Sequence, residues 1–180
     1  MKKLIIKRLL KKYRPSLVVI FGTYGHKEAR EAVRTVMSKY TKTYAAAAAD
    51  FFDNLYDDTG GFWGSMRALF LKRPFPHVCI IDALPEEKAY QELRKILSIN
   101  VVIVVPVGDI PSFSHVFSGP QKAAALITKE IKYAQHLLIN IDDETVRAIS
   151  DKVNIQKRFY GFDEHADIRV INVKNWLDLS

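Results

Sequence analysis

Residues 18–28 combine a short apolar run, a Gly-x-x-Gly turn and the start of a helical pattern. The apolar run 18–21 leads straight into Gly22, and Gly25 closes the turn before small and charged residues begin to alternate. A buried strand that enters a helix through such a turn directs backbone N–H groups and the positive end of the helix dipole toward an anion. This order of elements predicts a phosphate-binding loop.

The residues that follow Gly25 differ from those of the usual phosphate-binding loop. That loop continues Gly-Lys-Ser/Thr, in which the Lys contacts the outer phosphates and the hydroxyl contacts Mg²⁺. Here His26, Lys27 and Glu28 follow Gly25. The backbone pattern for phosphate binding is therefore present, whereas the side chains that supply charge and hold the metal are changed.

Strand-like and helix-like segments alternate along the whole chain. The expected strands are residues 16–21, 41–44, 76–82, 99–107, 135–141, 156–160 and 168–173. The expected helices are residues 1–14, 28–40, 62–71, 85–97, 121–134 and 142–150. The alternation is typical of an α/β fold with a doubly wound, mainly parallel sheet and helices on both faces. The chain of 180 residues is long enough to bury the core of one such domain, over residues 1–180.

Two segments fit this alternation less well. Residues 50–61 are acidic and aromatic and end in Gly60 and Gly61, so we expect a loop near a site. Residues 45–49 are five consecutive alanines. Alanine favours helix, but no amphipathic pattern surrounds the run, so we assign it to no element.

The N-terminal residues 1–14 predict a basic amphipathic helix that ends before Pro15. They carry seven positive charges and no acidic residue, which equals the net charge of +7. The interpretation that we favour places four residues on the core and leaves the lysines in water; the four are Leu4, Ile5, Leu9 and Tyr13. The alternatives are peripheral contact with a membrane surface or contact with an acidic polymer. We do not expect nucleic acid to be the partner.

Two features of the composition indicate a cytoplasmic setting. The single cysteine, Cys79, lies in an apolar run and cannot form a disulfide within the chain. No apolar stretch approaches the roughly 18 residues that a transmembrane helix needs.

Six segments of the sequence carry a resemblance to a known family. They are residues 14–25, 75–82, 108–111, 117–120, 138–144 and 160–168. In this order they resemble the central ATP-binding domain of the Mur ligases, the ATP-dependent enzymes that add amino acids to the peptidoglycan precursor. The member that adds D-alanyl-D-alanine is the most similar. The resemblance implies a P-loop type of α/β fold, ATP and Mg²⁺ as cofactors, and a closing hairpin over residues 160–168.

Carried over by position, the resemblance also assigns site residues. The implied nucleotide-binding residues are Gly22, Thr23, Tyr24, Gly25, His26, Lys27, Asn140 and Asp143. The implied metal ligands are Glu28, Asp82 and His115. His26 stands where the family has its phosphate-binding Lys, and Asp82 replaces a Glu. Asp142 and Asp143 are also explained as the N-cap of the helix that follows them, which is the interpretation that we favour.

Two functions remain open. In the first, the chain is the ATP- and Mg²⁺-binding part of an ATP-dependent amide ligase that acts on a peptidoglycan precursor. The chain ends at Ser180 without the domains that bind the UDP-sugar and bring the amino acid, so we expect it to need those domains or a partner protein for activity. In the second, it is a catalytically inactive, degenerate Mur-like domain that acts as a scaffold or protein-binding module.

Overall fold

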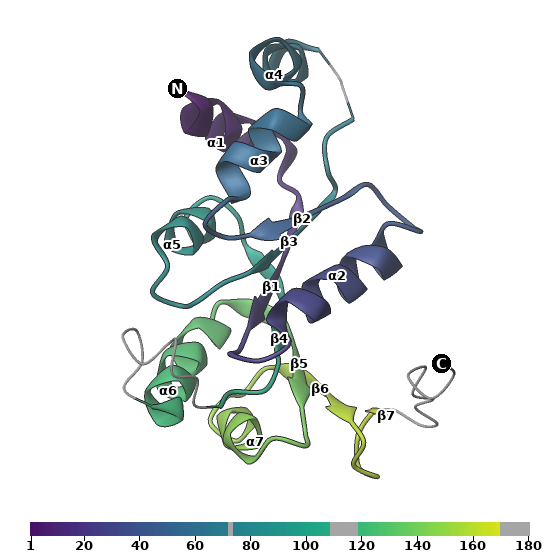
Figure 1. Cartoon of the computed structure of the whole chain (residues 1–180), viewed down its shortest axis with the longest axis vertical. Helices are drawn as coiled ribbons and strands as arrows, with labels where there is room; N and C mark the ends of the chain where they lie inside the picture. The colour runs from purple at the N-terminus through teal and green to yellow at the C-terminus, as the bar shows by residue number, and fades with distance from the viewer. Residues whose placement is uncertain (72–73, 109–118, 170–180) are drawn as a thin grey trace, which may run out of the picture.

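The computed structural model describes residues 1–71, 74–108 and 119–169, and within them seven strands form one all-parallel sheet (Figure 1). The strand order across the sheet is β2-β3-β1-β4-β5-β6-β7. The strands are β1 (Ser16–Phe21), β2 (Thr43–Ala47), β3 (Val78–Asp82), β4 (Ile99–Val104), β5 (Ala134–Asn140), β6 (Gln156–Gly161) and β7 (Ile168–Arg169). The sheet confirms the predicted fold class.

The helices cover the two faces of the sheet unequally. They are α1 (Lys2–Tyr13), α2 (His26–Met37), α3 (Phe51–Asp58), α4 (Gly61–Phe70), α5 (Lys88–Arg94), α6 (Pro120–Ile131) and α7 (Glu144–Ser150). All of them except α2 contribute to the large core on one face, while α2 packs over β1, β2 and β3 on the other. In β1, Leu17, Val19 and Phe21 face the large core, and Val18 and Ile20 face α2. Burial on both faces explains why this strand is apolar throughout.

The acidic segment predicted to be a loop is a helix, so that prediction was wrong. Helix α3 buries Phe51, Phe52, Leu55 and Tyr56 against α1 and β2. The spacing of these four residues places them on one face of a helix, and the aspartates between them lie on the solvent side.

The alanine run forms strand rather than helix. Residues Ala45, Ala46 and Ala47 complete β2 and pair with Ile80, Ile81 and Asp82 of β3. Hydrogen bonding to a buried neighbouring strand therefore overrides the helix propensity of alanine.

The predicted closing hairpin is also wrong, because β7 pairs with β6 in parallel. Tyr160 is opposite Ile168, and Gly161 is opposite Arg169. The carboxylate of Asp142 binds the start of the connection between the two strands. It accepts hydrogen bonds from the backbone N–H groups of Phe162 and Asp163.

Helix α1 packs into the core, as the favoured interpretation predicts, although Leu4 does not take part. Its buried residues are Ile5, Ile6, Leu9 and Leu10. Leu4 is 56% exposed. The side chain of Tyr13 stacks on the ring of Phe75 with the ring centroids 4.8 Å apart.

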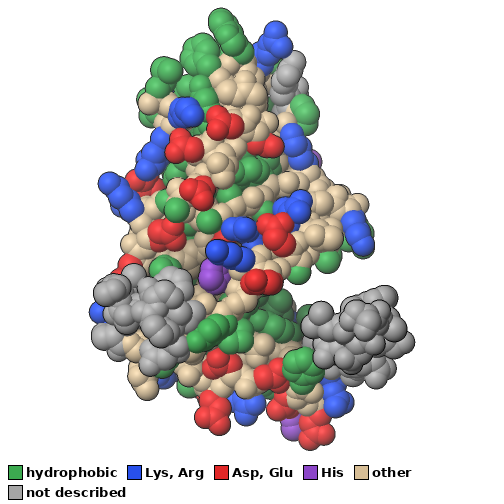
Figure 2. Space-filling model, viewed as in Figure 1, with side chains coloured by type: hydrophobic (Ala, Val, Ile, Leu, Met, Phe, Trp, Pro, Cys, Tyr) green, Lys and Arg blue, Asp and Glu red, His purple; other side chains and the backbone are tan. Residues whose placement is uncertain are grey.

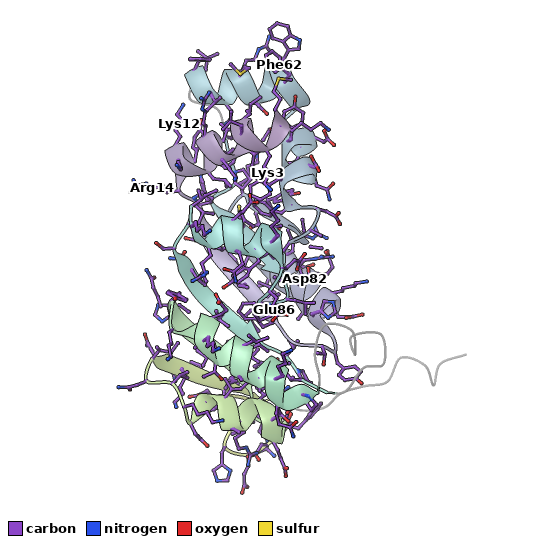
Figure 3. The ribbon with its side chains drawn as sticks, turned by 90° about the vertical axis from the view of Figure 1, so that its left-hand side faces the viewer. Lys3, Lys12, Arg14, Phe62, Asp82 and Glu86 are labelled. Atoms are coloured by element: carbon purple, nitrogen blue, oxygen red, sulfur yellow. The ribbon has the colours of Figure 1, made fainter. Side chains whose placement is uncertain are left out.

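Three lysines of α1 contact neighbouring elements. Two of them, Lys3 and Lys12, are labelled in Figure 3. Lys3 Nζ and Lys7 Nζ each lie 2.8 Å from Glu92 of α5. The hydrogen bonds that the two ammonium groups donate lower the pKa of Glu92 to about 2. Lys12 donates to the carbonyl oxygens of Ala68 and Leu69 in the last turn of α4, a favourable place for a cation. Contact of α1 with a membrane surface stays a prediction.

Basic and acidic side chains are interleaved on the surface around α2 (Figure 2). On that view of the molecule, the positive net charge does not gather into one patch over the helix. Within the described part of the chain, no helix has the length and apolar character required to cross a bilayer.

We expect α1 to be part of the cooperative fold, which a pair of matched substitutions in it can test. Leu9 is fully buried, so Leu9→Ala should lower the free energy of unfolding by about 3 kcal/mol. Leu4→Ala makes the same chemical change at an exposed position of the same helix and should lower it by less than about 0.5 kcal/mol. Urea unfolding followed by circular dichroism measures both, and equal losses would show that α1 is not docked as described.

Candidate functional site

The carboxyl ends of the central strands bring residues 22–28, Asp82, Gly108 and residues 140–143 to one edge of the sheet. The strand order reverses at β1, with β3 on one side and β4 on the other. The register places Ile20 opposite Asp82 and Phe21 opposite Val104, so the three strands end level with one another. Ligands of open α/β sheets bind at such a reversal.

The loop after β1 is fastened to the segment that leaves β4. The Thr23 hydroxyl accepts a hydrogen bond from Gly108 N–H at 2.8 Å and donates one to the Gly108 carbonyl at 3.1 Å. The backbone N–H groups of Thr23 and Tyr24 both donate to the carbonyl of Pro106, at 3.0 and 3.2 Å. These two N–H groups therefore already have partners within the protein, which leaves the residues after them as the candidate donors to a phosphate.

Two glycines shape this loop for different reasons. Gly22 has φ +146°, and a Cβ there would lie 2.3 Å from Val105 Cγ2, so the backbone passes too close to β4 for any side chain. Gly25 has φ +70° and open space around it, and it is the N-cap residue of α2. Glycine fits this left-handed conformation without strain.

The first turn of α2 is the part of the loop that remains free to meet an anion. Within the described residues, no side chain caps this helix. The N–H groups of His26, Lys27 and Glu28 have no partner inside the helix, because the first turn of every α-helix leaves its donors unpaired. Lys27 is exposed beside them, and the Nδ1 atom of His26 is buried with no hydrogen-bond partner among the described residues. This turn thus offers donors and positive charge together.

Asp82, at the end of β3, forms an ion pair with Arg30 of α2 and lies near His26 of the same helix. Arg30 Nη1 lies 2.5 Å from Asp82 Oδ1, and His26 Nε2 lies 3.6 Å from Asp82 Oδ2. The Asp82 side chain is only 5% exposed, so its charge is neutralised inside the protein. Arg30 is absent from the predicted site, but its position four residues after His26 places both side chains on the same helix face and was the signal that could have identified it.

The described residues do not fit the predicted magnesium site. Asp82 already contacts a guanidinium, Glu28 is exposed on α2, and His115 lies outside the described residues. Among the residues that are described, no three His, Cys, Asp or Glu side chains are grouped so that they could hold a metal. Mg²⁺ is commonly held by one or two protein carboxylates, with water and phosphate oxygens completing its octahedron, so the guanidinium on Asp82 is what argues against the site. A further positive charge about 4 Å from a guanidinium would cost about 4 kcal/mol per unit charge near a protein surface.

Asn140 and Asp143 both have structural partners. Asp143 Oδ1 accepts from Val146 N–H at 3.0 Å, which confirms the N-cap interpretation for this residue. Its other oxygen accepts from Val107 N–H at 2.9 Å and so fixes the segment that leaves β4. Asn140 Oδ1 accepts from Asp142 N–H at 2.8 Å. The N-cap interpretation was wrong for Asp142, which binds the connection after β6 instead.

Comparisons with known proteins find similarity in structure only. No family model matches the chain, and no curated protein sequence matches it. The MurF ligase from Thermotoga maritima, solved in complex with ADP, superposes with a TM-score of 0.63 at 14% identity, over 92% of this chain and 36% of that one. The UDP-N-acetylmuramoylalanyl-D-glutamyl-2,6-diaminopimelate–D-alanyl-D-alanyl ligase from Acinetobacter baumannii gives 0.59 at 14% identity, over 91% and 34%.

A third similar structure is another ligase with a related name. A UDP-N-acetylmuramoyl-L-alanyl-D-glutamate–2,6-diaminopimelate ligase gives a TM-score of 0.60 at 13% identity, over 89% of this chain and 36% of that one. The chain therefore spans about a third of the length of the solved ligases that it matches. At these identities the comparison shows a shared fold: the chain has the α/β fold found in the Mur ligases.

The two hydrogen bonds of Asp143 predict a measurable contribution to stability. Asp143→Ala removes a helix N-cap and leaves Val107 N–H without its carboxylate, and should lower the free energy of unfolding by about 2 kcal/mol. Glu144→Ala, one residue further on and exposed, removes only an acid near the helix dipole and should lower it by about 0.5 kcal/mol. Urea unfolding measures both, and a loss at Asp143 no larger than at Glu144 would contradict the assigned roles.

Proposed function

We propose that this chain is a Mur ligase-like central domain that binds the phosphate groups of a nucleotide at the N-terminus of α2. The observation that carries the proposal is the uncapped first turn of α2, which follows Gly25 at the point where the strand order reverses. The similarity to a Mur ligase solved with ADP supports a nucleotide as the ligand. The anion would be held by the N–H groups of residues 26–28 and by the helix dipole.

The hydrogen bonds of the loop support binding because they fix it before a ligand arrives. The Thr23 hydroxyl and the Pro106 carbonyl hold residues 23–24 against the end of β4, and Asp143 holds Val107 from the other side. A site that is already ordered loses less entropy on binding. Lys27, exposed next to this first turn, would contribute charge to the outer phosphates.

In a complete Mur ligase such a domain serves amide-bond formation at the expense of ATP. The chain spans about a third of the solved ligases, so ligation by it would require further domains or a partner protein. The second candidate is a binding module without ligase chemistry. The observation that favours this candidate is the Asp82–Arg30 ion pair, which occupies the acid that the family resemblance assigns to magnesium. The cytoplasmic setting stays a prediction under either function.

Calorimetric titration with ADP tests the proposal. We expect binding near micromolar strength, about −8 kcal/mol. Lys27→Glu places an acid beside the phosphates at the positive end of the helix and should weaken binding by at least about tenfold, or 1.4 kcal/mol.

The matched control is Lys39→Glu, just beyond the other end of α2. Lys39 is also exposed, so the variant makes the same change in net charge at a distance from the first turn. Its affinity should stay within about twofold of the parent chain, because exposed charges beyond a Debye length of about 8 Å are screened. Equal losses in both variants would indicate non-specific attraction, and no binding at millimolar ADP would refute the proposal.

A further inference from the structure

The guanidinium of Arg30 lies beside the carboxylate of Asp82, where a divalent cation would otherwise bind. Its Nη1 atom touches one carboxylate oxygen of Asp82 at 2.5 Å, and His26 Nε2 lies 3.6 Å from the other oxygen. The three side chains are 17%, 5% and 23% exposed, in the order Arg30, Asp82 and His26. Both oxygens of this buried acid therefore have a nitrogen neighbour supplied by α2.

Arg30 is also fixed from its other side. Its Nε atom lies 3.3 Å from Glu31, which in turn contacts Arg34 at 2.7 Å. A guanidinium carries its charge at every pH at which the protein is folded and cannot be displaced by deprotonation. The cation beside Asp82 is thus a permanent part of the helix that begins at the phosphate-binding turn.

The donors that would face a phosphate need no metal either. They are backbone N–H groups of the first turn of α2, whose positive dipole end already favours an anion. Arg30 lies one helical turn further along the same helix, on the face shared with His26. The charge that neutralises Asp82, which a bound metal would otherwise bring, is therefore supplied here by the chain itself.

We propose that this site binds its phosphate ligand as the metal-free anion, with Arg30 neutralising Asp82 in place of a divalent cation. The proposal rests on the proposed function for its ligand class, a nucleoside diphosphate or triphosphate. It adds that affinity does not depend on Mg²⁺. It also favours the binding module over the ligase, because Asp82 is not free to hold the metal that the family resemblance assigns to it.

The first experiment compares ADP binding by calorimetry in excess EDTA and in excess MgCl₂. The two dissociation constants should agree within about threefold, or 0.65 kcal/mol. Tightening by tenfold or more in MgCl₂ would overturn the proposal.

Two variants then assign the effect to Arg30. In EDTA, Arg30→Gln should weaken ADP binding by about tenfold, and MgCl₂ should restore part of the loss, because Asp82 is now free to attract the cation. The control is Arg34→Gln, one turn further along α2, which removes the same charge away from Asp82. Among the described residues the ion pair of Arg34 is with the exposed Glu31, so this variant should bind ADP like the parent chain in both buffers. Equal behaviour of the two variants would contradict the role of Arg30.

A buried carboxylate without its partner can unfold a protein, so a second variant guards against that outcome. Arg30→Gln combined with Asp82→Asn removes both charges and should restore the circular dichroism spectrum and melting temperature if Arg30→Gln alone loses them. This double variant should bind ADP weakly, and MgCl₂ should not improve its binding. Metal-enhanced binding by the double variant would show that the metal acts elsewhere.

A measurement without nucleotide separates this proposal from the proposed function. Titration with Mn²⁺, followed by electron paramagnetic resonance, should give the same bound fraction for the parent chain and for Asp82→Asn, because Asp82 does not bind metal in the parent. A smaller bound fraction for Asp82→Asn would overturn the proposal even if no ADP binds. If ADP fails to bind in either buffer, the proposed function and metal-free binding both fail, and agreement of the two Mn²⁺ titrations would then show only that Asp82 does not bind metal. ADP binding that requires MgCl₂ would overturn this proposal alone.

Discussion

The hydrogen bonds that hold β1 between β3 and β4 determine where every part of the candidate site lies. Because the strands are parallel and in the observed register, β1 delivers its loop beside Asp82 on one side and beside the exit of β4 on the other. The position of this loop therefore follows from the position of β1. The hydroxyl of Thr23 and the carbonyl of Pro106 fasten it to that exit, and Asp143 fastens the exit to α7. A shift of β1 by one residue would separate all of these partners and turn its core side chains to the wrong faces.

Within this frame, the electrostatics of the edge are balanced inside the chain. Asp82 is buried and would be strongly destabilising if it stood alone, at a cost of about 3–5 kcal/mol. Arg30 offsets that cost from α2, one turn from the unpaired N–H groups of the same helix. The same helix therefore neutralises Asp82 and carries the unpaired N–H groups of the proposed anion site. Under the proposed function, the loop would rely on backbone donors in place of the lysine and hydroxyl side chains of the usual phosphate-binding loop.

The sequence predicts the long, strongly patterned parts of the molecule well. The strand at residues 16–21 matches β1 residue for residue, and the N-cap at Asp143 follows from ordinary helix-start chemistry. The misses have physical causes: pairing with β3 overrides the propensity of the alanine run, and the aspartates of α3 conceal its helical spacing. In the site, Thr23 and Tyr24 turn their N–H groups to Pro106, a partner more than eighty residues away that no local pattern reveals. Arg30 was missed because its partner, Asp82, lies at the end of β3, and its distance from α2 depends on how β3 pairs with β1.

Amide NMR spectra of the isotope-labelled chain, recorded during a titration with ADP in the presence of EDTA, would test whether the N-terminus of α2 binds a phosphate without a metal. We expect the largest changes in chemical shift at the backbone amides of residues 25–28, and we expect these changes to saturate without any divalent cation. The amides of Thr23 and Tyr24, already bonded to Pro106, should change less. Absence of changes in residues 25–28, or changes that develop only after Mg²⁺ is added, would contradict this expectation.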